Sequence, residues 1–244
     1  MAVGLLGCSD STDRPASAAS EPSPADAASA IPNLIKSMVT IPGKNYKMGR
    51  YEVTQAQWES VMGTNPSKFK NANNPVEKVS WNDCQEFLGK LNALPDVRKS
   101  GLFFRLPTDV EWQDACRAGS TGDYCKLPDG TEIREETLDD VAWYRKNAHG
   151  ETHPVGKKKP NAYGLYDMHG NVGEWNLSAA GEARAFRGGS WSATAKFCAC
   201  SAGDELSPSA RFGHIGFRLL ALSQDNVSQA VTNRVKGVVE TGKN

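Results

Sequence analysis

The amino-acid sequence predicts a single α+β domain in which helices come first and short strands with long loops follow. Three segments in the first half repeat apolar side chains at helical spacing, each behind a Ser or Thr that can cap a helix. From about residue 121 to 220, Gly, Pro and Asn divide the chain into short segments. The 6 Trp, 8 Phe and 6 Tyr among 244 residues are enough for one sizeable core.

The three predicted helices begin after Thr54, Ser80 and Thr108, because the side-chain oxygen of each can accept a hydrogen bond from a free N–H of the first turn. Behind Ser80, the apolar positions follow helical spacing and include Cys84. We therefore expect Cys84 to be buried as a small apolar residue. Before the first of these helices, residues 35–41 alternate apolar and polar side chains and predict a strand.

The two ends of the chain differ from the middle in composition. Residues 9–33 are mostly Ser, Asp, Ala, Pro and Glu, and such a stretch cannot bury enough apolar surface to order its backbone. We expect a disordered tether over residues 1–33, a compact domain over 34–222 and a polar tail over 223–244. The tail holds a weak helical pattern formed by Val227, Val231, Val235 and Val238.

The segment Leu5-Leu6-Gly7-Cys8 resembles a bacterial lipobox, in which the cysteine becomes the lipid-modified first residue of the mature protein. Only four residues precede the motif, whereas a signal peptide needs a basic start and a longer apolar stretch, so we expect that the signal peptide is truncated here. The alternative is a chance match. A lipid on Cys8 would anchor the chain to a membrane, at the cell surface or the outer membrane, and would leave five cysteines, an odd number.

Charge separates this chain from dedicated nucleic-acid binders. The 28 Lys and Arg balance 28 Asp and Glu, and the pI is near 6.9. Nucleic-acid binders normally show a basic excess or stripe, so we expect no nucleic acid as a partner. The sequence has no run of about 18 apolar residues, the length that would predict a membrane-spanning helix. The cysteines show no C-x-x-C spacing, which argues against a zinc ribbon or a thioredoxin-type motif.

Five motifs occur in a fixed order, and together they are specific although each alone is weak. They are YEVTQAQW at 51–58, PVEKVSWND at 75–83, FRLPTDVEW at 104–112, NAYGLYDMHGNVGEW at 161–175, and RGGSW at 187–191 with GFRL at 216–219. Through these motifs the chain resembles the formylglycine-generating-enzyme, or sulfatase-modifying-factor, family. The resemblance implies a C-type-lectin-like fold with short twisted antiparallel sheets, two to three helices and much irregular loop.

The resemblance raises a catalytic alternative. Enzymes of this family oxidise a substrate cysteine with a copper ion held by two cysteines, and soft thiolates suit Cu(I). Here Cys198 falls on the second of these cysteines but Ala193 falls on the first, and Cys200 has the wrong spacing to replace it. We therefore predict no catalytic residue and no required cofactor, and we disfavour a formylglycine-generating-type copper oxidase or a sulfatase-modifying enzyme.

A second branch with this fold fits the sequence better, namely the variable proteins of diversity-generating retroelements, and within it the treponemal variable lipoprotein type. The resemblance places a variable region at 176–220, where adenine-directed mutagenesis would exchange selected side chains. The positions expected to vary are Ser192, Ala193, Thr194, Phe197, Cys200, Ser207, Ser209, Phe212, Gly213 and His214. The expected constant frame is Gly188, Gly189, Ser190, Trp191, Gly216, Phe217 and Arg218.

On this hypothesis, the protein is a surface-displayed, non-catalytic lipoprotein that binds an unknown ligand, a protein or another macromolecule, through the variable positions. Phe197, Phe212 and His214 are the strongest contact candidates, because exposed aromatic side chains carry much of the energy of an interface. The alternatives are a core position for Phe197 and a solvated loop position for His214, and Cys200 would be an exposed free thiol. A third hypothesis is an assembly module of a surface machine.

The family resemblance also implies a metal site. Residues of the enzymes that match Asp167 and Glu174 hold a structural Ca²⁺, and carboxylate oxygens are the ligands that Ca²⁺ prefers. The alternative is a hydrogen-bonded loop without metal. Arg105, Glu111 and Arg187 lie in the same motifs, and we expect them to form structural ion pairs that support the loops.

Overall fold

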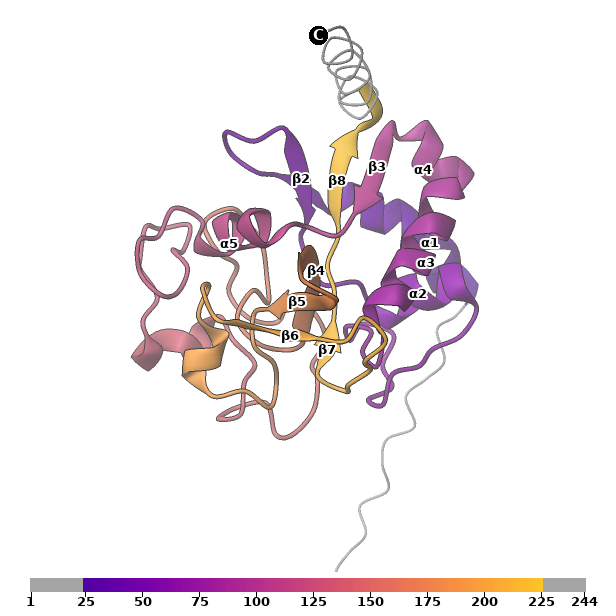
Figure 1. The fold of residues 1–244 in the computed structure, drawn as a ribbon. Helices are drawn as coiled ribbons and strands as arrows, with labels where there is room; N and C mark the ends of the chain where they lie inside the picture. The colour runs from indigo at the N-terminus through magenta and orange to yellow at the C-terminus, as the bar shows by residue number, and fades with distance from the viewer. Residues whose placement is uncertain (1–23, 226–244) are drawn as a thin grey trace, which may run out of the picture.

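The computed structural model describes residues 24–225, which form two four-stranded sheets, with most of the helices beside the first sheet and long loops around the second (Figure 1). Cys8 and the valine pattern of the predicted tail lie outside the described residues. Within the described range, no helix has both the length and the apolar composition needed to cross a membrane.

The first sheet joins the two ends of the described chain. Its antiparallel strands lie in the order β1–β2–β8–β3, and their bounds are Met38–Thr40, Tyr46–Gly49, Leu220–Ser223 and Leu102–Arg105. The main core is formed by side chains of this sheet and of the helices beside it. There the ring of Phe87 stacks on Trp58 at 5.3 Å and meets Phe217 edge-on at 5.4 Å.

The second sheet is built almost entirely from the predicted variable region. Its strands lie in the order β6–β5–β4–β7, and their bounds are Gly203–Leu206, Ala183–Arg187, Gly173–Ala180 and Ile215–Gly216. Strand β7 pairs in parallel with β4, whereas the other pairs are antiparallel. The chain therefore leaves this sheet at β6, passes through an exposed loop at 207–214, and returns to it at β7.

The three helices predicted from capping residues are confirmed. They are α2 (Gln55–Met62), α3 (Trp81–Ala93) and α5 (Asp109–Arg117), and each follows its cap directly. Each cap oxygen accepts a hydrogen bond from the backbone N–H three residues on, at 3.1 to 3.4 Å. Cys84 of α3 is fully buried, as expected.

Two further helices correct the sequence-based prediction, which expected two to three. Helix α1 (Pro24–Lys36) makes the tether prediction wrong for residues 24–33, and the predicted strand at 35–41 shrinks to β1. The mean composition of that stretch hides two buried apolar side chains, Ala30 and Ile31, which α1 buries together with Leu34. Helix α4 (Pro95–Lys99) begins at a proline, which suits the first helical position, and buries Val97.

The loop-rich character of the second half is confirmed. Between α5 and β4, residues 118–172 contain no α-helix and no named strand, and their one helix is the 3₁₀ helix η1 (Glu135–Asp140). A second 3₁₀ helix, η2 (Ala195–Cys198), follows β5. Together with the loop residues Tyr124 and Tyr144, both 3₁₀ helices contribute side chains to one buried apolar cluster. This cluster fixes the base of η2 on the loops.

Candidate functional site

The predicted variable positions are mostly accessible. Phe197 is 55% exposed and Phe212 is 42% exposed, so the core alternative for Phe197 is wrong. Ser207 and Ser209 are exposed as well. All but one of the remaining positions are partly exposed, namely Ser192, Ala193, Thr194, Gly213 and His214. The exception is Cys200, which is fully buried, so the prediction of an exposed and variable thiol there is wrong.

The backbone of the loop before β7 is held by groups outside that loop. The carbonyls of residues 212–214 accept hydrogen bonds in turn from the backbone N–H of Lys78 at 3.1 Å, the indole N–H of Trp191 at 2.8 Å and the backbone N–H of Gly173 at 2.8 Å. None of these bonds involves a side chain of the loop itself. The loop can therefore keep its shape when its side chains change.

The stretch that enters η2 is anchored in the same way. The backbone N–H of Arg145 donates to the carbonyl of Ala193 at 3.0 Å, and its guanidinium Nε donates to that of Ser192 at 2.8 Å. The hydroxyl of Tyr124 donates to the carbonyl of Ala195 at 3.2 Å. Here too, the segment contributes main-chain oxygens and the surrounding loops contribute the donors.

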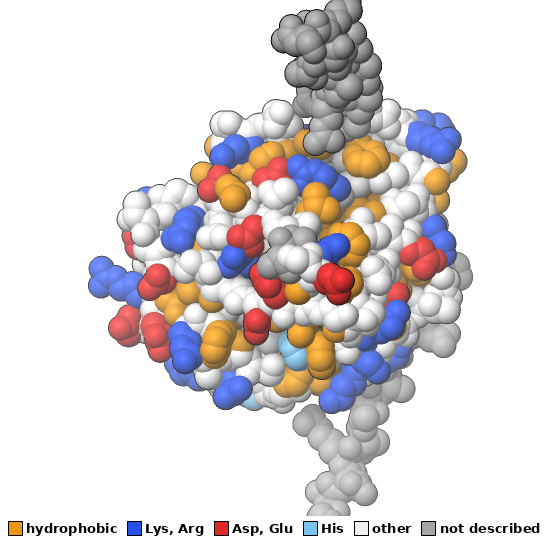
Figure 2. Space-filling model, viewed as in Figure 1, with side chains coloured by type: hydrophobic (Ala, Val, Ile, Leu, Met, Phe, Trp, Pro, Cys, Tyr) orange, Lys and Arg blue, Asp and Glu red, His pale blue; other side chains and the backbone are white. Residues whose placement is uncertain are grey.

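Aromatic side chains gather at the loop before β7. The rings of Phe212 and His214 stack, with centroids 5.4 Å apart and an interplanar angle of 26°. The ring of Trp191 meets Phe69 edge-on at 5.4 Å. Figure 2 shows hydrophobic side chains beside a histidine on the lower part of this face, with charged side chains around them. Such a mixture of rings and small polar residues is typical of surfaces that bind other proteins.

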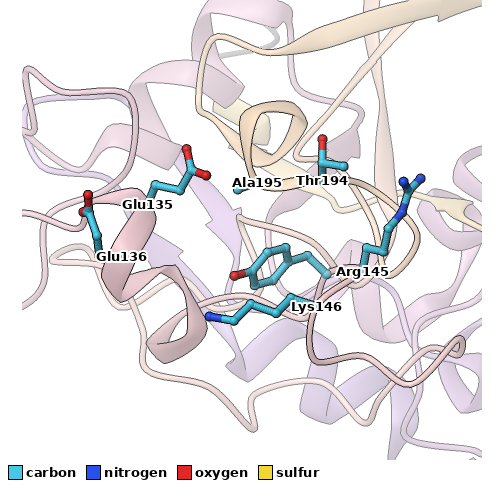
Figure 3. Close-up of a pocket in the computed structure, with 7 residues that line it drawn as sticks. Glu135, Glu136, Arg145, Lys146, Thr194 and Ala195 are labelled. Carbon is cyan, nitrogen blue, oxygen red and sulfur yellow. The ribbon is translucent and has the colours of Figure 1, made fainter.

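A pocket of about 710 Å³ lies between η1, η2 and the loop at 144–146 (Figure 3). Glu135 and Glu136 line one side of the pocket. Arg145 and the predicted variable position Thr194, which directly precedes η2, lie on the other side. The hydroxyl of Thr194 is buried without a hydrogen-bond partner among the described residues. A side chain exchanged at this position would therefore reshape the pocket while its charged walls stay fixed.

Cys200 is buried in a cluster with Cys116 and His169. The sulfur and nitrogen atoms of the three side chains that could bind a metal lie within 4.8 Å of one another. The Sγ atoms of the two cysteines are 2.6 Å apart, closer than unbonded sulfurs normally approach. Nδ1 of His169 donates to the carbonyl of Cys198 at 2.7 Å, and its Nε2 accepts the N–H of Cys125 at 3.2 Å. Because both ring nitrogens are engaged, the geometry favours a thiol pair over a metal site.

This cluster was missed by the sequence analysis. Cys116 and Cys200 lie 84 residues apart, and neither belongs to a short metal-binding or redox motif. The odd count of cysteines gave no pairing either. The sequence shows only that Cys116 lies in a predicted helix and that Cys200 follows Cys198 by two residues, and neither fact indicates that Cys116 and Cys200 are in contact.

The residues that would hold copper in the family do not fit a copper site here. Cys198 is buried, and burial raises the pKa of its thiol to about 12, so it is protonated at neutral pH. Ala193 offers no ligand atom at the matching position. A linear Cu(I) site needs two thiolates, and the two matching positions supply a single cysteine.

The two candidate calcium ligands differ in availability. Both carboxylate oxygens of Glu174 accept hydrogen bonds from Arg218 at 2.7 Å, and the indole of Trp112 donates to one of them at 2.6 Å. Asp167 accepts the N–H of Gly156 with one oxygen, while its other oxygen is buried without a partner. The two residues therefore do not fit a calcium site in which both carboxylates are ligands.

The predicted structural ion pairs are confirmed. Arg105 holds Glu111 through two hydrogen bonds of 2.7 and 2.6 Å, and Glu111 also caps the first turn of α5. Arg187 of β5 pairs with Asp109, with Nη2 lying 2.7 Å from one carboxylate oxygen. Both pairs lower the pKa of the carboxyl group against the opposing effect of burial. The first pair ties α5 to β3 of the first sheet, and the second pair ties it to β5 of the second sheet.

The chain is similar to several known proteins. The Sulfatase-modifying factor enzyme 1-like domain matches residues 32–222. The Chaperone protein LppX of Paenibacillus barcinonensis is 33% identical over 176 residues, which cover 54% of this chain and 61% of that protein. The Formylglycine-generating enzyme of Mus musculus is 28% identical over 197 residues, covering 69% of this chain and 50% of that one. The chain thus spans about half to three-fifths of these relatives.

The relatives differ in activity. The Inactive C-alpha-formylglycine-generating enzyme 2 of Bos taurus is 31% identical over 156 residues, covering 59% of this chain and 47% of that protein. Among solved structures, Treponema denticola variable protein 1 superposes with a TM-score of 0.63 and 29% identity, covering 77% of this chain and 91% of that one. PvdO from Pseudomonas aeruginosa follows at 0.60 and 25%, with 72% and 80% covered. The α+β, C-type-lectin-like fold is confirmed.

Proposed function

The chain belongs to the Sulfatase-modifying factor enzyme 1-like domain family, and from that premise we propose that it is a non-catalytic ligand-binding protein whose exposed side chains in 192–214 are exchangeable contacts. A lipid on Cys8 would display the domain at a cell surface or on the outer membrane. The similarity to Treponema denticola variable protein 1 supports the binding role with exchangeable contacts.

The observation that carries this proposal is the anchoring of the loop backbone. Three successive carbonyls at 212–214 accept hydrogen bonds from a fixed frame, and the carbonyls of Ser192 and Ala193 accept hydrogen bonds from Arg145. Positions whose backbone is held by main-chain carbonyls can exchange their side chains at little cost in stability, and so change the ligand. Phe212 and Phe197 supply exposed rings and His214 a partly exposed one.

The absence of catalysis is supported by the thiol chemistry. Ala193 stands where the first copper-binding cysteine would be, so Cys198 has no partner for a copper-binding pair, and inactive members of the family exist among the relatives. Relatives that are enzymes exist as well, which keeps oxidation of a substrate cysteine as the competing function. Oxygen uptake with a cysteine-containing sulfatase peptide and added copper would support that competitor and count against this proposal.

Sequence variation provides the direct test of exchangeable contacts. Sibling isolates should differ mainly at the exposed positions of 192–214, and a near-copy of this segment should lie beside a reverse-transcriptase gene. Trp191, Gly188 and Gly189 should stay constant, since the frame depends on them. Differences spread evenly over 34–222, or concentrated outside 176–214, would contradict the proposal.

Tolerance to substitution provides a second test that needs only the purified protein. Phe212→Ser and Phe197→Ser should each change the free energy of unfolding by less than about 1 kcal/mol, because both side chains are exposed. The matched frame variant Trp191→Phe removes the indole donor to Gly213 and should loosen the loop at 207–214, which hydrogen exchange would report. Equal losses from all three variants would count against a side-chain-independent loop.

A further inference from the structure

Three exposed lysines lie near the aromatic loop before β7, and two of them, Lys70 and Lys78, lie close enough to the buried Glu77 to stabilise its charge. The Nζ of Lys68 lies 4.8 Å from the ring of Phe69, and its Cδ lies 3.9 Å from where a Cβ on Gly213 would stand. The backbone of Lys78 holds the carbonyl of Phe212 at 3.1 Å. We call this the lysine–aromatic face and define it by Lys68, Lys70, Lys78, Phe69, Phe212 and His214.

The face carries positive charge on a neutral protein. Lys68, Lys70 and Lys78 are exposed, and none of them forms an ion pair with the described residues. The neighbouring Arg211 is already paired with Asp83 through two hydrogen bonds of 2.7 Å and adds no net charge. Over the whole chain the charges cancel at 28 against 28, so this excess is local.

One buried carboxylate lies beneath the face. Glu77 is fully buried, and one of its oxygens accepts the backbone N–H groups of Lys68 and Phe69. Its other oxygen has no partner among the described residues and lies 3.4 Å from where a Cβ on Gly213 would stand. Even when Glu77 is ionised, three lysines stand against one carboxylate, and the exposed charge is positive only.

The rings give the face an apolar platform. Phe212 stacks on His214 and is 42% exposed. Burial lowers the pKa of His214 below its ordinary value, so this ring is neutral at pH 7 and adds no charge. A complementary partner would thus offer negative charge around an apolar side chain.

We propose that the lysine–aromatic face binds a protein segment in which Asp or Glu side chains flank an exposed apolar side chain. This rests on the proposed function, which it deepens by naming the chemistry of the ligand. A protein segment fits better than a nucleic acid. The phosphate backbone requires an extended run of positive charge, whereas this run is three lysines, bounded by Asp83 and placed above Glu77. An acidic polysaccharide would present negative charge without an apolar side chain to pack on the rings.

The test is a selection of displayed random peptides on the full-length protein, repeated on the double variant Lys68→Gln/Lys78→Gln. The expected peptides carry net negative charge next to a large apolar residue, and this bias should vanish on the double variant. A control outside the face is Lys99→Gln, in the last turn of α4, which should enrich the same peptides as the wild type. Because all these lysines are exposed, the variants should remain folded.

The strongest selected peptide then serves as the probe in a titration. Its affinity should fall about threefold to tenfold with each of Lys68→Gln and Lys78→Gln, should fall with added salt, and should fall with Phe212→Ala. Glu77→Gln, which removes the buried negative charge, should instead raise affinity. Single-stranded DNA and heparin should compete poorly.

Three results would overturn the inference. They are a selection that enriches no peptide, a selection whose peptides lack acidic bias, and competition by single-stranded DNA at least as strong as that by the peptide. These failures are distinct from a failure of the proposed function. If sibling sequences vary at 192–214 while the lysine variants bind like the wild type, the acidic-ligand inference is wrong and the exchangeable surface stands. If the exposed loop residues prove invariant, both fall.

Discussion

The guanidinium of Arg218 holds both carboxylate oxygens of Glu174 at 2.7 Å, and neither side chain has any solvent exposure. Arg218 also donates to the carbonyls of Gly49 and Tyr166 at 2.9 Å. One residue near the end of the domain thus connects the first sheet, the second sheet and the loop before it. This pair also occupies the carboxylate that the family resemblance assigns to calcium.

Breaking this pair from one side should be strongly destabilising. We expect Arg218→Met to lower the free energy of unfolding by about 3 to 5 kcal/mol, because Glu174 would be left as a buried charge without its partner. The double variant Arg218→Met/Glu174→Gln should recover part of that loss. Urea denaturation followed by tryptophan fluorescence measures both. A loss below about 1 kcal/mol in the single variant would mean that the pair is not structural.

Two glycines of the variable region should respond differently to the same substitution. Gly189 has φ of 73°, and a Cβ there would stand 2.6 Å from the Sγ of Cys198 and 2.8 Å from a backbone oxygen. Gly189→Ala should therefore cost about 3 kcal/mol or more. Gly213 has ordinary φ and its nearest contact would be 3.4 Å, so Gly213→Ala is the matched control and should cost less than about 1 kcal/mol. Thermal unfolding compares them, and similar midpoints would refute the distinction between frame and contact glycines.

Asp167 should make the domain less stable as pH rises. Burial raises the pKa of its carboxyl from 3.8 to about 6, with Glu174 adding to the rise and Arg218 and the hydrogen bond from Gly156 opposing it. The folded state therefore binds a proton more tightly than the unfolded state. The contribution is favourable below about pH 4 and is lost as the pH climbs through about 6.

The variant Asp167→Asn isolates this effect. Asn keeps an acceptor for the N–H of Gly156 and tolerates the φ of 57° at this position. We expect it to gain about 1 to 3 kcal/mol at pH 7 and almost nothing at pH 4. The exposed Asp123→Asn is the control and should show no such gain. Stabilisation of the wild type, but not of Asp167→Asn, by added Ca²⁺ would instead identify Asp167 as a cation ligand.

Oxidation should join Cys116 and Cys200, whose Sγ atoms are 2.6 Å apart. With oxidised glutathione as the oxidant, the protein should lose two titratable thiols, and the new bond should raise stability by roughly 2 to 4 kcal/mol because it closes a long loop. Thiol titration in denaturant and thermal unfolding measure this. Cys200→Ser should abolish the change, whereas Cys84→Ser in α3 should leave it intact. An unchanged thiol count in the wild type would show that the two sulfurs do not react.

The sequence by itself determined the local features of this protein. The caps Thr54, Ser80 and Thr108 begin their helices as predicted, and Cys84 is buried, because capping and helical spacing depend on residues three or four positions away. The ordered motifs also predicted the fold and the loop-rich second half. The failure at α1 came from averaging composition over residues 9–33, which concealed the few apolar side chains that dock there.

The tertiary structure decided what depends on distant parts of the chain. Cys200 is buried because α5 brings Cys116 against it, and residue type alone could not separate it from the exposed positions around it. Glu174 is committed to Arg218 rather than free for a cation, since β8 returns the end of the domain to its start. Lys78 likewise meets Phe212 only through the fold, since 134 positions of sequence separate them. Which distant residues meet is set by packing between elements, and sequence periodicity does not say which elements pack together.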